Sequence, residues 1–258
     1  MKAYPGWAAV GAVLGLMLGL VLLAPAVWMA RGVAAASSGQ VQLSDARGSV
    51  WRGNAQLVLS GGAGSSDALA LPGRLEWFID PVLQGLRIRL YADCCTALPL
   101  DIRLMPGWSG LAVQLADGNS QWPAALLVGL GAPWNTVQPQ GSLNLSTQGL
   151  SVEWFEGRLR ISGVARVEAL GMSSRLSTLR PLGSYRLQMV GNSGQQSALL
   201  QLETLEGSLG LTGAGQWNGS RWSFRGEASA AAESEPALGN LLNLLGRRQG
   251  AKSLISFG

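Results

Sequence analysis

Leu-Arg-Ile-Arg-Leu-Tyr, residues 86–91, alternates apolar side chains with basic or polar ones. Because successive side chains of a β-strand point to opposite faces of a sheet, this alternation predicts a strand with one buried face. The same pattern recurs at residues 100–104, 185–189 and 221–225. The chain is therefore predicted to be mainly β, with apolar strand faces that stack or curl around a shared core.

Glycines open many of the predicted strands, as at Gly73, Gly141, Gly157 and Gly207. Glycine permits tight turns and bulges between antiparallel neighbours, so we expect a long, curved, antiparallel sheet over residues 40–258. The spacing of these glycines is too irregular for a repeat family with a fixed period.

Two short helices are expected to interrupt the strands. The first expected helix covers residues 122–130, which begin with Trp122 and Pro123. The second covers residues 235–248, in which leucines recur at spacings of three and four. Gly246 offers a stop for the second helix, and Arg247 and Arg248 would complement the dipole at its C-terminal end. The leucine stripe is predicted to pack on the sheet.

The N-terminal segment from residue 7 to residue 30 contains no charged residue. It exceeds the ~20 apolar residues that a helix needs to cross a bilayer, and therefore predicts a single transmembrane helix. Residues 1–6 would form a cytoplasmic stub, residues 31–39 a linker and residues 40–258 a periplasmic domain. A cleaved signal peptide is the alternative, although its apolar region normally runs only about 7–15 residues.

Tryptophans and glycines add detail to this segment. Trp7 and Trp28 lie near its two ends, where indoles favour the headgroup level. Gly11, Gly15 and Gly19 share one helical face, which would let a partner helix approach closely. Glycine is also simply frequent in membrane helices, so the spacing alone leaves both interpretations open.

The residue types exclude most catalytic chemistry. The chain has no histidine, which removes Ser-His and Cys-His nucleophile pairs. Acids that could serve a carboxylate hydrolase occur singly; they are Asp80, Asp93, Asp101, Glu153 and Glu156. We therefore predict no enzyme activity, no catalytic residues, no metal site and no cofactor.

The two cysteines, Cys94 and Cys95, are adjacent, so they form neither a CxxC redox pair nor a zinc-ligand set. Two free or buried thiols are the simpler interpretation, because a bond between neighbouring cysteines closes a strained small ring. An oxidising compartment keeps that vicinal disulfide open as the alternative.

The net charge of +4 comes from arginines scattered along the chain, with Lys2 and Lys252 as the only lysines. A nucleic-acid surface would show a basic cluster with interleaved aromatic residues, which is not found here. Solvated arginines on outer strand faces explain the charge, and attraction to anionic lipid or an acidic partner is the alternative.

A set of short motifs follows the apolar segment in a fixed order. They are Gly48-Ser49-Val50-Trp51-Arg52-Gly53, Gly73-Arg74-Leu75-Glu76-Trp77 continuing to Asp80-Pro81, Pro181-Leu182-Gly183-Ser184-Tyr185, Gly215-Gln216-Trp217, and Leu241-Leu242-Asn243-Leu244-Leu245-Gly246-Arg247-Arg248. In this order and spacing the chain resembles the type II secretion system protein N family, also called general secretion pathway protein N.

The resemblance implies an accessory inner-membrane component of the machine that exports folded periplasmic proteins through an outer-membrane secretin. Its expected partners are other type II secretion components, contacted through the Gly11, Gly15, Gly19 face and an exposed sheet edge. A periplasmic lipid-handling protein with an apolar β-groove is the alternative. Strands with two apolar faces would favour that alternative, whereas the polar alternate positions are typical of a one-sided sheet.

Overall fold

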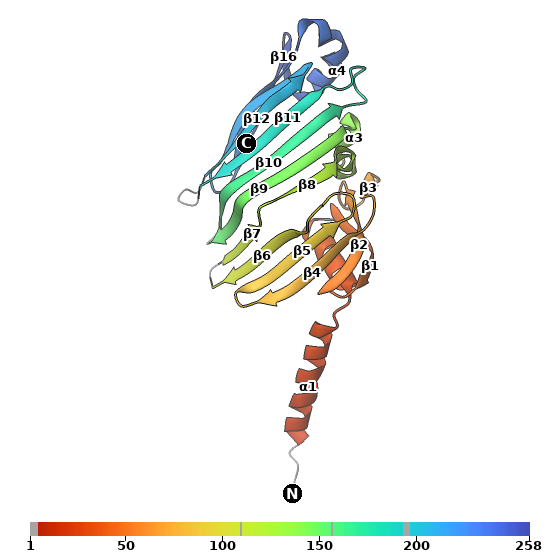
Figure 1. The fold of residues 1–258 in the computed structure, drawn as a ribbon, viewed down its shortest axis with the longest axis vertical. Helices are drawn as coiled ribbons and strands as arrows, with labels where there is room; N and C mark the ends of the chain where they lie inside the picture. The colour runs from red at the N-terminus through yellow and green to blue at the C-terminus, as the bar shows by residue number, and fades with distance from the viewer. Residues whose placement is uncertain (1–4, 109, 156, 193–196) are drawn as a thin grey trace.

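The computed structural model describes residues 5–108, 110–155, 157–192 and 197–258 (Figure 1). Most of these residues form one antiparallel sheet of sixteen strands. The strands are β1 (Val41–Gly48), β2 (Arg52–Ser60), β3 (Ala68–Ala70), β4 (Leu75–Val82), β5 (Gly85–Ala92), β6 (Leu100–Gly107), β7 (Gly110–Leu115), β8 (Gly118–Pro123), β9 (Gln140–Phe155), β10 (Arg158–Ser173), β11 (Gly183–Gly191), β12 (Ala198–Gly207), β13 (Leu209–Trp217), β14 (Trp222–Ala230), β15 (Arg247–Gln249) and β16 (Lys252–Phe257). The helical segments are α1 (Pro5–Leu22), α2 (Ala26–Ala36), the 3-10 helix η1 (Ala124–Leu130), α3 (Trp134–Val137), the 3-10 helix η2 (Ala232–Ser234) and α4 (Glu235–Leu245).

Most neighbours in the sheet are consecutive in the chain, which confirms the predicted mainly antiparallel β fold. The strand order is β1-β2-β4-β5-β6-β7-β9-β10-β11-β12-β13-β14-β16-β15, with β3 beside β2 and β8 beside β9. β7 pairs with residues 150–155 of β9, and β8 pairs with residues 142–147 of the same strand. The two short strands thus lie end to end along one edge of β9, and the sheet divides there.

The register of the strands gathers apolar side chains on one face. Ile79 lies opposite Ile88, Ile88 opposite Ile102, Ile102 opposite Leu115, and Leu115 opposite Leu150. Since directly paired residues of neighbouring strands point to the same face, this row runs across five strands without a polar interruption. The alternation predicted from residues 86–91 is confirmed.

A β-bulge in β9 preserves this arrangement along its sixteen residues. Between the pairs Ser162–Ser151 and Val164–Gln148, β9 supplies one more residue than β10. Gly149 lies within this extra step and has a φ of +56°, a left-handed conformation that glycine adopts without strain. The bulge keeps Leu145 on the same face as Val152, although their positions differ by an odd number.

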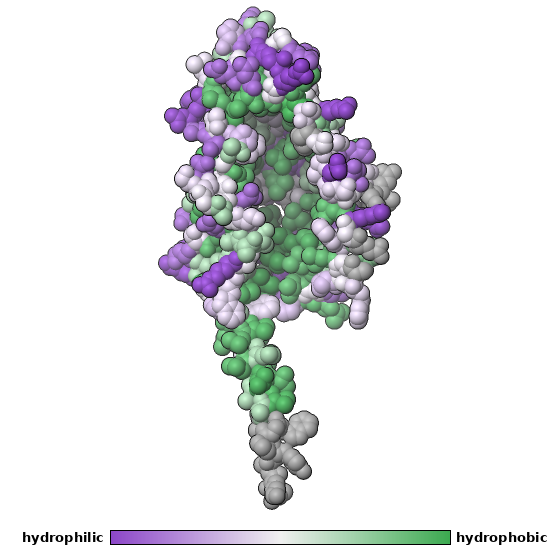
Figure 2. All heavy atoms as spheres, turned by 180° about the vertical axis from the view of Figure 1, so that it is seen from behind, coloured by the Kyte–Doolittle hydropathy of each residue, from purple (hydrophilic) through white to green (hydrophobic). Residues whose placement is uncertain are grey.

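The sheet is a single curved layer, and its apolar face is hollowed (Figure 2). α2 covers this face at one end, where Ala26 packs with Ala55 and Trp77. α4 covers it at the other end with Leu238 and Leu241. In the described part of the chain no second sheet closes over the middle, so the expected shared core is replaced by separate clusters at the two ends and under η1.

The apolar N-terminal segment forms two helices, whereas the sequence led us to expect one over residues 7–30. α1 ends at Leu22 and α2 begins at Ala26, because Pro25 has no N–H to donate and disfavours helical backbone at the preceding residue. α2 also occupies most of the predicted linker at residues 31–39. Among the described residues, no helix combines the length and apolar character needed to cross a bilayer. Residues 1–4 of the predicted stub lie outside the described residues.

Both helices predicted within the β domain are present, with different ends. η1 begins at Ala124 because Trp122 and Pro123 belong to β8. α4 ends at Leu245, and Arg247 and Arg248 enter β15 instead of completing the last helical turn. The guanidinium of Arg248 donates at 2.6 Å to Oε1 of Glu235, the first residue of α4.

Substitution of Leu242 tests whether α4 stabilises the fold through its leucine stripe. Leu242 is fully buried between α4 and the sheet, so Leu242→Ala should lower the free energy of unfolding by about 2–5 kcal/mol. Leu244 lies on the same helix and is 43% exposed, so Leu244→Ala should cost less than about 1 kcal/mol. Urea unfolding followed by circular dichroism measures both; equal losses would contradict this packing.

Candidate binding surfaces

The turn between β1 and β2 ties the N-terminal helices to the sheet. The backbone N–H of Val50 donates to the carbonyl of Ala24 at 2.8 Å, and the indole N–H of Trp51 donates to the carbonyl of Val21 at 2.8 Å. Pro25 also forms an isolated β-bridge with Ser49. The last carbonyls of a helix have no intrahelical partners, so the bond from Trp51 satisfies the carbonyl of Val21 at the end of α1. The bond from Val50 to Ala24 holds the residues after α1 against the sheet.

Trp77 brings two of the sequence motifs together. Its side chain is 1% exposed, and its indole N–H donates to the carbonyls of Ser49 and Val50 at 3.2 and 3.1 Å. A Cβ added to Gly53 would lie 2.5 Å from Cζ2 of Trp77. Only glycine therefore fits at position 53, because the indole lies directly against the backbone.

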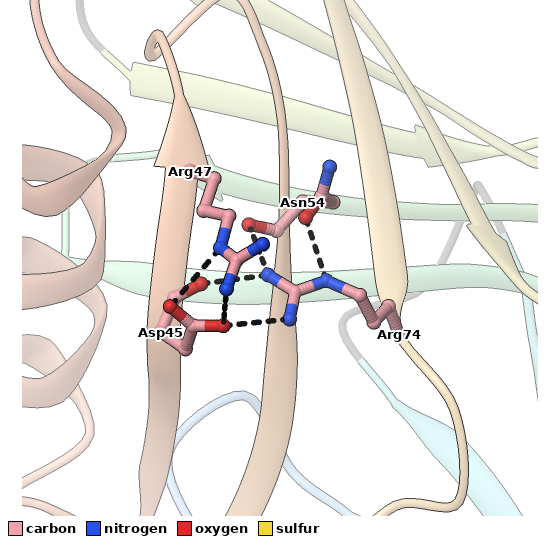
Figure 3. Close-up of polar contacts among 4 residues, drawn as sticks. All are labelled: Asp45, Arg47, Asn54 and Arg74. Atoms are coloured by element: carbon pink, nitrogen blue, oxygen red, sulfur yellow. Dashed lines mark hydrogen bonds and ion pairs between the residues drawn. The ribbon is translucent and has the colours of Figure 1, made fainter.

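A cluster of charged side chains crosslinks β1, β2 and the start of β4 (Figure 3). Arg74 donates from Nη1 to Oδ2 of Asp45 at 2.9 Å and from Nε to Oδ1 of Asn54 at 2.6 Å. It also donates to the backbone carbonyl of Asp45 at 2.7 Å. Arg47 pairs with the same carboxylate at 2.9 Å. Asp45 has a φ of +51° in a bulge of β1, so the cluster holds an irregular point of the sheet edge.

The hollowed face provides an extended apolar surface, which we call the trough. Between α2 and α4 the trough carries Ile88, Ile102, Val113, Leu115, Leu145, Leu150, Val152, Val167, Leu187, Met189 and Leu200. None of these side chains is buried, and Leu187 remains 36% exposed. Its neighbour Gln188, on the opposite face, is less exposed than Leu187. The trough is therefore an apolar surface that the fold leaves open.

The opposite face carries the ion pairs and many polar side chains, and it exposes Val190 and Leu199 where β11 pairs with β12. Arg89 pairs with Asp80 at 2.8 Å, and Arg87 pairs with Asp101. Two acids that we considered for a hydrolase are thus engaged with arginines. Asp93 lines a separate pocket, Glu153 is exposed, and Glu156 lies outside the described residues. No group of acids or cysteines in the described ranges could hold a metal ion.

The adjacent cysteines form a disulfide in the structure, which corrects the simpler expectation of two thiols. The loop that contains them is tied to β8, because the carbonyl of Cys95 accepts a hydrogen bond from the N–H of Gln121 at 2.8 Å. A pocket of about 730 Å³ opens beside this loop, with Tyr91, Asn119 and Arg166 in its lining. Its lining mixes acidic, basic and amide groups and forms no metal-ligand set.

The motifs in the second half of the chain hold the upper strands. Tyr185 donates from its hydroxyl to the carbonyl of Leu209 at 3.1 Å, and a Cβ on Gly183 would lie 2.9 Å from that hydroxyl. Trp217 donates from its indole N–H to the carbonyl of Leu159 at 3.0 Å and contacts Trp222 with ring centroids 5.5 Å apart. These motif residues are structural, and each fixes a contact between strands.

The predicted contact surfaces differ in how open they are. A Cβ added at Gly11, Gly15 or Gly19 meets nothing within 4 Å, so this face of α1 is free. The outer strands of the sheet are protected: β1 carries the bulge at Asp45, and β15 has three residues including two arginines. Bulges, charges and short lengths all discourage addition of another strand.

A family model described as type II secretion system (T2SS), protein N, matches residues 39–254. The chain belongs to this family. The protein is therefore a type II secretion component, and the resemblance inferred from the ordered motifs is confirmed. No curated protein and no solved structure matches the chain.

Replacement of Gly53 tests the contact between the two family motifs. Gly53→Ala places a methyl group 2.5 Å from both Trp77 and the carbonyl of Arg47, so it should destabilise the fold by roughly 1–3 kcal/mol. Gly32→Ala is the matched control, because a Cβ there meets nothing within 4 Å and alanine favours a helix. Thermal unfolding should separate the two variants; an unchanged Gly53→Ala protein would contradict this packing.

The Asp45 cluster predicts a pH dependence. The guanidinium of Arg47 and then that of Arg74 hold the pKa of the Asp45 carboxyl below its ordinary value of 3.8. A lowered folded-state pKa means that the carboxylate stabilises the fold above the unfolded-state pKa, and that this contribution is lost as the pH falls through the folded-state pKa. Asp45→Asn should therefore reduce the loss of stability between about pH 5 and pH 2. Identical pH profiles in urea unfolding would refute this.

Proposed function

We propose that the protein is an accessory inner-membrane component of the type II secretion system, and that it acts by binding other components during export of folded periplasmic proteins. The family match over residues 39–254 carries this proposal. The absence of histidine and the engagement of Asp80 and Asp101 in ion pairs support a binding role without chemistry of its own.

Exposed apolar residues of α1 support attachment to the inner membrane, with the sheet in the periplasm. Leu14, Leu16 and Met17 are 62%, 66% and 61% exposed and point in different directions around the helix. Contact of this surface with water would cost about 25 cal/mol per Å², whereas contact with lipid would not. We therefore assign α1, within the segment at residues 7–30, to the single-pass anchor.

The open glycine face of α1 supports a helix partner in the membrane. Gly11, Gly15 and Gly19 recur every four residues, and in the described chain nothing outside the adjacent residues and backbone of α1 itself lies within 4 Å of the position of a Cβ at any of them. Small residues at this spacing let two helix backbones approach and pack. Since the outer strands are protected, this face is the better candidate for contact with another secretion component.

Leucine at Gly11, Gly15 and Gly19 should weaken co-purification with inner-membrane secretion components and reduce secretion of exported proteins. The helix itself should persist, because leucine is a good helix former. Leucine at Val13, Met17 and Val21 is the matched control, since these residues share the opposite face of α1. Affinity purification from gently solubilised membranes and assay of secreted proteins measure both effects.

The proposal has two separable points of failure. If the glycine variant retains every partner and the control variant behaves identically, the helix contact is wrong. If deletion of the whole protein changes secretion of no substrate, the accessory role itself is wrong.

A further inference from the structure

We propose that the trough binds the acyl chains of a phospholipid, a role beyond that of a secretion component. The site consists of the apolar face of the sheet between α2 and α4, where Val113, Val152 and Leu187 lie near the middle. Figure 2 shows this face as a continuous apolar hollow.

The chemistry of the trough matches a ligand without hydrogen-bonding groups. From β4 to β14, the positions that share this face in the described strands carry apolar or aromatic side chains, glycine, proline and three residues with aliphatic hydroxyls. The hydroxyl of Thr147 donates to Ala116, that of Thr204 donates to Leu211, and that of Ser120 accepts from Trp122. A ligand on this face would bury apolar surface and make van der Waals contacts, but it would find no free charge or amide. Such a surface suits a hydrocarbon chain.

The length of the trough is also sufficient. From β5 to β12 the sheet makes six steps between neighbouring strands, or roughly 29 Å at ~4.8 Å a step. One leaflet of the bilayer core is about 15 Å thick, half of the ~30 Å hydrocarbon thickness. The trough is therefore long enough to hold an acyl chain along its axis.

Continuity with α1 favours a membrane lipid over other apolar ligands. In Figure 2 the apolar surface of α1 lies just below the lower end of the hollow. α2, which covers that end, itself exposes Val27 and Trp28 at 42% and 51%. This part of the inference rests on the proposed membrane attachment of α1, because that attachment would place the lower end of the trough next to the bilayer.

A photoreactive residue in the trough tests the occupant directly. A diazirine-bearing leucine analogue at position 187 of the full chain, irradiated in native membranes, should form adducts with phospholipid mass on the peptide that contains it. The same analogue at position 188 projects from the polar face and is the matched control. We expect at least about tenfold more lipid adduct at 187 than at 188. Adducts with a polypeptide, equal labelling at both positions, or no lipid adduct at 187 would overturn the proposal.

Charge substitutions give a second, independent readout. Val113→Glu and Leu187→Glu place carboxylates in the trough, whereas Gln114→Glu and Gln188→Glu place them on the polar face of the same strands. Labelling of the full-chain protein in phosphatidylethanolamine and phosphatidylglycerol vesicles by a phospholipid with a diazirine in its acyl chain should fall about tenfold for the trough variants only. Leu187 is already partly exposed, so this variant should keep its circular dichroism spectrum even if Val113→Glu unfolds.

The results separate this inference from the proposed secretion role. Trough variants that remain folded and label as well as their controls would refute lipid binding while leaving the secretion role intact. Loss of labelling in folded trough variants supports lipid binding whether or not secretion depends on the protein.

Discussion

Hydrogen-bonded pairing of strands β4 to β14 fixes which side chains share a face, and the other elements are arranged around that division. The row from Ile79 to Leu150 faces the hollow, while the neighbouring row pairs Asp80 with Arg87 and Arg87 with Arg103. A shift of one residue in the pairing of β4 with β5, or of β5 with β6, would turn charged groups into the trough. The charged residues therefore mark one face as solvated, and α2 and α4 pack on the other.

A single layer must curve to shelter its apolar face, and the sequence provides room for that curvature at a few positions. Gly213, Gly215 and Gly226 lie around Phe224, which is only 6% exposed, and a Cβ on any of them would meet its ring at 3.0 Å or less. Because these three positions are glycines without side chains, the ring of Phe224 can lie against the backbone of β13 and β14. The bulge at Gly149 also allows curvature, because it bends β9 and keeps the apolar side chains on one face.

Sequence patterns predicted the local elements and left open what depends on distant contacts. The alternation at residues 86–91 and the leucine spacing in α4 identified a strand and a helix, because both depend on periodicity alone. The break at Pro25 was missed because the apolar run was interpreted only by its length. The Arg74 cluster joins residues twenty or more positions apart, so only the register of three strands brings it together. Bonding between Cys94 and Cys95 depends on a loop conformation that composition does not reveal.

The sequence argument about lipid handling considered only the alternation along single strands. Strands with two apolar faces were expected to favour lipid binding, and the alternation indicated one apolar face. In one curved layer, a single apolar face is enough to line a groove, and the polar face can remain solvated. The contacts of Trp51 with Val21 and of Val50 with Ala24 then matter beyond stability, because they fix α1 at one end of that groove. A component that binds the glycine face of α1 would therefore also fix the position of the trough. The turn between β1 and β2, which carries a family motif, thus couples the two proposed binding surfaces.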